Sequence, residues 1–153
     1  MTPLVLSLVL TAAPAPARTT SVDVGGVRIR VDRAWTHVVD GDTHRFTAPE
    51  GETWFALDSG TVQTAGMAAD TCVQKIRMAL GGKMAARTVG GQPAAYGTAV
   101  DKDKKGKRFI TDTWVGCDGK ITWSVTGHRL AETEGPGPVQ SFVESLTFVK
   151  GGK

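Results

Sequence analysis

The sequence predicts an α+β fold, in which a mainly antiparallel β-sheet of about seven strands carries two amphipathic helices packed on it. Segments with an apolar residue at every second position recur along most of the chain, as in strands with one buried face. Two later segments, beginning at Met67 and at Pro136, instead place apolar residues at helical spacings of three and four. Each helix must bury its apolar stripe, and we expect the sheet to cover it.

The strands are expected where the period of two is clearest. Val27, Ile29 and Val31 alternate with polar residues, which predicts a half-buried strand with a basic outer face. The remaining strands are expected at residues 35–39, 43–48, 54–57, 85–89, 94–100, 109–117 and 120–127.

Two Asp-Gly steps predict tight hairpins and therefore fix the expected strand registers. With Asp40-Gly41 as a two-residue turn, His37 lies opposite His44. With Asp118-Gly119 as the second turn, Trp114 lies opposite Trp123. Such a tryptophan pair is typical of core packing, and a platform for ligand stacking is the alternative.

The helices are expected at residues 67–80 and after Pro136 and Pro138. The first ends at Gly81-Gly82, where glycine supplies the left-handed cap, and its apolar face includes Cys72. The second carries a stripe that we expect to be buried against the sheet, formed by Val139, Phe142, Val143 and Leu146.

Length and composition describe one globular domain. The chain has 153 residues, of which 41% are hydrophobic and 22% charged, which is neither a disordered nor a membrane-spanning composition. The net charge of +3 is too small to indicate a nucleic-acid partner.

The first residues resemble a secretory signal peptide. An apolar run, Leu4 to Leu10, precedes small residues that include Ala15 and Ala17. Signal peptidase requires small residues at the first and third positions before the bond it cuts, and these two alanines occupy them if the cut follows Ala17. We therefore expect residues 1–17 to be a signal peptide and residues 18–153 to be the mature domain. No basic residue precedes the apolar run, and the alternative is a buried N-terminal strand. A run this short predicts no transmembrane anchor.

The two cysteines agree with export. Cys72 and Cys117 are the only cysteines, and an even pair in an exported chain predicts a disulfide. Neither has a second Cys or His at metal-ligand spacing, so zinc is the weaker interpretation. The predicted location is periplasmic or extracellular.

The order of these elements resembles PsbP-like and DcrB-like domains. The resemblance rests on the segment VRIRVDRAW at residues 27–35 and on the ending SFVESLTF at residues 141–148, and it spans roughly residues 22–149. It implies an α/β/α sandwich around an antiparallel sheet. It implies no activity, because domains of this kind serve as accessory subunits, adaptors and envelope proteins.

Candidate chemistry is sparse. The sequence contains no nucleophile elbow, phosphate-binding loop or paired metal-ligand motif, so we predict no catalytic residue and no cofactor. The one candidate metal site is the expected cross-strand pair of His37 and His44, with Asp42 as a third ligand. The lysine-rich hairpin tip from Lys102 to Arg108 is expected to be solvated, with weak contact to an anionic surface as its functional alternative.

These observations favour a small exported accessory or binding protein that is not an enzyme and whose partner is a protein or another envelope component. An inhibitor or immunity-type protein of a secreted enzyme is one alternative. A pI near 9.0 disfavours inhibition of basic hydrolases. A metal-dependent hydrolase is the other alternative, and the histidines are the only candidate active-site residues for it.

Overall fold

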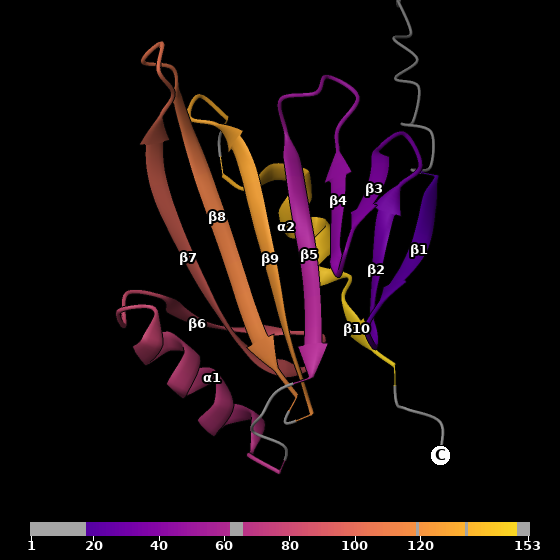
Figure 1. Cartoon of the computed structure of the whole chain (residues 1–153), viewed down its shortest axis with the longest axis vertical. Helices are drawn as coiled ribbons and strands as arrows, with labels where there is room; N and C mark the ends of the chain where they lie inside the picture. Colours follow the sequence, from indigo (N-terminus) through magenta and orange to yellow (C-terminus); the bar gives the residue numbers. More distant parts are fainter. Residues whose placement is uncertain (1–17, 62–65, 119, 134, 150–153) are drawn as a thin grey trace, which may run out of the picture.

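The computed structural model describes residues 18–61, 66–118, 120–133 and 135–149, and within them it shows an α+β fold (Figure 1). Two antiparallel sheets are accompanied by helices α1 (Ala69–Ala79) and α2 (Gly137–Glu144). The predicted fold class is therefore confirmed. The strands are β1 (Thr19–Val24), β2 (Val27–Asp32), β3 (Thr36–Asp40), β4 (Thr43–Thr47), β5 (Trp54–Thr61), β6 (Ala85–Val89), β7 (Gln92–Lys102), β8 (Arg108–Cys117), β9 (Ile121–Leu130) and β10 (Thr147–Phe148).

The large sheet has seven strands in the order β3-β4-β5-β9-β8-β7-β6. A second sheet, β1-β2-β10, was not predicted. Two of its strands, β1 and β10, were not expected because neither shows a clear apolar pattern. Strand β1 reads TTSVDV and is mostly exposed, and β10 has two residues. The β1–β2 turn is made by Gly25 and Gly26, both with positive φ, which glycine adopts without strain.

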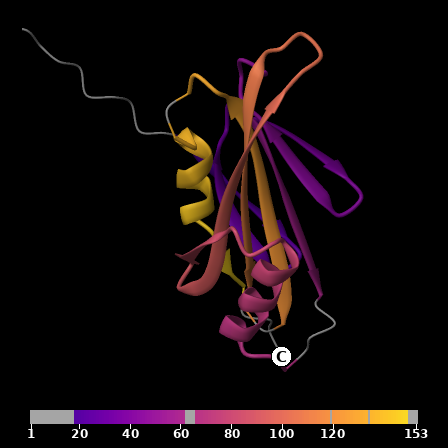
Figure 2. The same cartoon turned by 90° about the vertical axis from the view of Figure 1, so that its left-hand side faces the viewer.

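The main core lies between one face of the large sheet, here called the inner face, and a layer formed by α2 and the small sheet. Figure 2 shows α2 on this side of the large sheet. Three residues of the predicted stripe, Val139, Val143 and Leu146, are buried, whereas Phe142 is half-buried and packs on Trp35 and Phe55. The rest of the inner-face core includes Val27, Ile29, Val31, Phe46, Leu57, Trp114, Trp123 and Val125.

Helix α1 packs on the opposite, outer face of the large sheet, at the end where β8 finishes. Cys72 of α1 is disulfide-bonded to Cys117 of β8, with Cα atoms 6.1 Å apart, as predicted. Val73, Ala95 and Val115 complete a second buried cluster around this bond. No helix in the described ranges is long and apolar enough to span a membrane.

The predicted register of the β3–β4 hairpin is wrong by two residues. Asp40 pairs with Thr43, so the central residues of the turn are Gly41 and Asp42. Gly41 has φ of 59°, and no described residue other than glycine has a positive φ. The predicted turn needed a positive φ at Asp40 as well, whereas the observed turn needs it only at glycine. His37 therefore lies opposite Phe46, and His44 lies opposite Val39.

The β8–β9 register is also shifted by two, so that Trp114 pairs with Val125 and Trp123 with Gly116. The Asp118 carboxylate accepts hydrogen bonds from the backbone N–H groups of Lys120 and Ile121, which widens the connection beyond two residues. A shift of two preserves the face of every side chain. Both tryptophans remain on the inner face, with exposures of 5% and 2%, and pack in the core as expected.

Candidate functional site

A row of rings crosses the outer face at the end of the large sheet that α1 leaves uncovered. Trp54 on β5 stacks on His128 on β9, with centroids 5.3 Å apart and planes 5° apart. Phe109 on β8 lies 4.7 Å from the His128 ring, and the Arg45 guanidinium lies 4.2 Å above the Trp54 ring. The strand pairing of Trp54 with His128 places these side chains on one face. We call these four residues the outer row.

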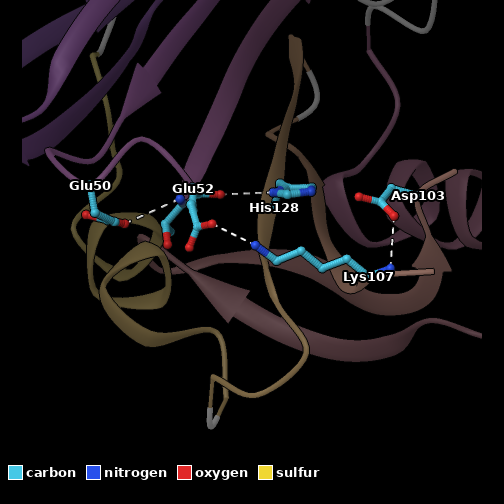
Figure 3. A network of polar contacts seen from close by, with 6 residues as sticks. Glu50, Glu52, Asp103, Lys107 and His128 are labelled. Carbon is cyan, nitrogen blue, oxygen red and sulfur yellow. Dashed lines mark hydrogen bonds and ion pairs between the residues drawn. The ribbon is translucent and has the colours of Figure 1, made fainter. Parts of the chain in front are cut away.

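A hydrogen bond orients the central histidine of the row (Figure 3). The Nδ1–H of His128 donates to the Glu52 carbonyl oxygen at 3.2 Å. In the neutral imidazole this bond places the single proton on Nδ1 and leaves Nε2 as an acceptor. His128 as a whole is half-buried.

Charged groups surround the row. Lys107 donates to the Glu52 carboxylate at 2.7 Å, and this bond raises the pKa of the lysine (Figure 3). Arg45, Glu52, Lys107 and Asp103 line a groove of about 290 Å³ together with the outer-row rings, Gly51 and Leu130. Flat apolar rings beside both signs of charge suit a ligand or protein segment that has an apolar face and polar edges.

The lysine-rich tip from Lys102 to Arg108 contributes Asp103 and Lys107 to the lining of this groove. The Asp103 carboxylate accepts hydrogen bonds from the backbone N–H groups of Lys105 and Lys107. Because Lys107 is also paired with Glu52, part of the basic charge is neutralised locally. The predicted contact with an anionic surface stays a prediction.

The histidine pair is assembled by the β3–β4 hairpin despite the shifted register. His37 and His44 are diagonal neighbours on one face, with His37 Nε2 3.0 Å from His44 Nδ1 and ring centroids 5.1 Å apart. The His37 ring also stacks on Phe46, 4.4 Å away. Partial burial, and secondarily the neighbouring charge of His44, lower the pKa of His37.

The predicted third ligand does not join this pair. Asp42 lies exposed in the turn, and the described part of the chain contains no group of three His, Cys, Asp or Glu residues placed to hold a metal ion. The turn places Asp42 at a central position, whereas the predicted register had put it in the strand, on the face of the histidines. The three-ligand site is therefore corrected to a pair.

A buried polar cluster lies on the inner face. Arg129 Nε donates to Asp112 at 2.7 Å, and the Tyr96 hydroxyl donates to the same carboxylate at 2.6 Å. Burial, and then the bond to Asp112, raise the pKa of Tyr96 to about 12. The sequence offered no signal for this cluster or for the outer row, because neither has a local spacing motif and both depend on cross-strand neighbours.

Comparison with known proteins supports the fold. The sequence matches no family model and no curated protein. Its structure is similar to a crystal structure from Bacteroides thetaiotaomicron VPI-5482, with a TM-score of 0.73 and 11% identity over 91% of this chain. The alignment covers 51% of that protein, so this chain spans about half its length.

A second similar structure is LpqN of Mycobacterium tuberculosis, described as involved in cell envelope biogenesis. The TM-score is 0.63 and the identity 13%, and the alignment covers 89% of this chain and 93% of LpqN. The structural similarity shows a shared fold, and at sequence identities this low it shows nothing beyond the fold. No family model confirms the PsbP-like or DcrB-like resemblance at the level of a family.

Proposed function

We propose that this chain is an exported accessory protein that binds a component of the cell envelope through the outer row and catalyses no reaction. The outer row carries the proposal, because three adjacent rings and an arginine lie on an uncovered sheet face beside a charged groove. Aromatic and arginine side chains are enriched where proteins bind partners.

Two further observations support an extracytoplasmic place of action. The disulfide between Cys72 and Cys117 is a bond that persists in oxidising compartments. The fold is shared over most of its length with LpqN, whose description concerns the cell envelope. Residues 1–17, the predicted signal peptide, lie outside the described residues.

Photo-crosslinking in the producing cells tests the proposal. A photoreactive amino acid replaces Lys107 at the rim of the groove, and in a second strain it replaces Arg30, which is exposed on β2. We expect a covalent adduct with an envelope component from position 107 and a weaker one from position 30. Adding Trp54→Ala should abolish the first adduct, whereas Val100→Ala, at an exposed position of β7, should leave it unchanged.

The identity of the adduct separates the competing functions. An adduct with a secreted enzyme that is inhibited by the purified chain would indicate an inhibitor instead. Equal adducts from positions 107 and 30, or adducts with cytoplasmic proteins, would contradict the proposal. The thermal unfolding midpoint of Trp54→Ala, measured on purified protein, distinguishes loss of binding from loss of the fold.

A further inference from the structure

The pair formed by His37 and His44 is independent of the outer row. The outer-row side chains lie on the outer face, whereas the two histidines share a face with Phe46, which belongs to the inner-face core. In Figure 2 the β3–β4 hairpin leans away from the side that carries α2. The hairpin thus reaches solvent, where His37 is exposed and His44 is half-buried.

The separation of the two imidazoles matches chelation of one metal ion. Metal–imidazole bonds are about 2.0–2.1 Å long. Two such nitrogens are then about 2.9 Å apart at a ligand angle of about 90° and about 3.4 Å apart in a tetrahedron. The observed distance of 3.0 Å between His37 Nε2 and His44 Nδ1 is closest to the tetragonal value. Tetragonal nitrogen and oxygen coordination is typical of Cu²⁺, which also binds imidazole most strongly among the divalent first-row metals.

The surroundings hold the pair ready for a cation. Stacking on Phe46, which itself stacks on Phe55 at 4.7 Å, connects the His37 ring to the core and restricts its rotation. The adjacent turn carries two exposed carboxylates, Asp40 and Asp42, whose charge favours a nearby cation.

We propose that His37 and His44 chelate one Cu²⁺ ion through the two facing ring nitrogens, with water completing a tetragonal coordination sphere. Neither ring needs to lose a net proton, because a neutral imidazole can carry its single proton on the nitrogen that faces away from the metal. The hydrogen bond between the rings is replaced by two metal–nitrogen bonds.

Calorimetric titration with CuCl₂ tests this site on the mature chain, purified without a histidine tag and studied in a buffer that does not bind copper. We expect one equivalent to bind, and the affinity to fall at least about tenfold in His37→Ala and in His44→Ala. His128→Ala is the matched control, since it removes a histidine held in the outer row, and it should leave the affinity unchanged. Electron paramagnetic resonance of the Cu²⁺-loaded protein should show two equatorial imidazole nitrogens in the wild type and one in each single variant.

Circular dichroism and thermal unfolding of the metal-free variants show whether the hairpin change has disturbed the fold. His37→Gln and His44→Gln provide a second pair of variants that keep a polar side chain without an imidazole. Copper binding that persists in His37→Ala/His44→Ala would overturn the proposal, as would a wild-type chain that binds no copper. Loss of the outer-row adduct does not bear on this site, so the two proposals can fail separately.

Discussion

Asp112 and Arg129 are the charged residues buried in the described core, and each is held by the other. Their side chains are 2% and 8% exposed, and Arg129 also donates to the Thr133 carbonyl oxygen at 2.7 Å. A buried charge is tolerated only beside a charged or hydrogen-bonding partner. Without one, the free-energy cost of its desolvation would exceed the stabilisation gained by packing its side chain in the core. The pair, with Tyr96, closes the β7-β8-β9 end of the inner face.

Removing the acid should therefore leave an unpaired buried guanidinium. We expect Asp112→Asn to lower the free energy of unfolding by about 3–5 kcal/mol, measured by urea denaturation. The control is Asp23→Asn, which breaks the exposed pair of Asp23 with Arg28 and should cost less than about 1 kcal/mol. Similar small losses in both variants would show that Arg129 finds other partners.

Gly116 is required by its cross-strand neighbour. A Cβ at this position would overlap the indole ring of Trp123, which lies across the glycine in the next strand. We expect Gly116→Ala to cost about 1–3 kcal/mol of unfolding free energy, because the buried ring must move. Gly60→Ala in β5 is the matched control, since a Cβ there meets nothing within 4 Å. Equal urea midpoints for the two variants would mean that the core accommodates the methyl group.

At the scale of elements, the hydrophobic periodicity of the sequence predicts the helices and most strands, but it does not predict the registers in which the hairpin strands pair. The buried positions of α2 and the Cys72 face of α1 are visible in the sequence because one element alone sets a helical stripe. The register of a hairpin depends on which residue takes the positive φ, and Asp40-Gly41-Asp42 offers two solutions that differ by one turn position. The outer row depends on pairing among four strands, which no local pattern contains.

The β3–β4 hairpin should lose stability on acidification. The pKa of His37 is lowered in the folded state, so the unfolded chain takes up its proton first as the pH falls below about 6.5. The stabilisation is present above that value and is lost as the pH falls through the lowered pKa. Amide hydrogen exchange in β3 and β4 should therefore accelerate between about pH 7.5 and about pH 5.5, after correction for intrinsic exchange rates.

His37→Gln removes the titrating group, and its hairpin exchange should lose this pH dependence. His44→Gln should reduce it only in part, since burial is the larger cause of the lowered pKa and the charge of His44 the smaller. A wild-type hairpin whose corrected exchange is independent of pH would contradict this argument.

At the scale of the whole molecule, the two faces of the large sheet differ in how they are covered. The inner face is closed by α2 and the small sheet, whereas α1 closes only one end of the outer face (Figures 1 and 2). The disulfide connects that helix to β8 across 45 residues of sequence, at the covered end of the outer face. A disulfide persists in an oxidising compartment, so its contribution to stability depends on the predicted export of the chain.

Export should consequently determine how stable the molecule is. All described elements follow Arg18, since β1 begins at Thr19, so a cut after Ala17 leaves every described strand and helix in the mature chain. Production of the full chain in an exporting bacterial host should yield a protein that begins at Arg18 and has no free thiol.

Residues 18–153 produced in a reducing cytoplasm should have the same fold with both thiols free. This reduced chain should be less stable by about 4 kcal/mol, because the disulfide restricts a long loop in the unfolded state. Mass spectrometry of thiol-alkylated samples and urea denaturation measure both quantities, and Cys72→Ala/Cys117→Ala should match the reduced chain in either host. An exported protein that retains residues 1–17, or equal stabilities for the oxidised and reduced chains, would break the connection between compartment and fold.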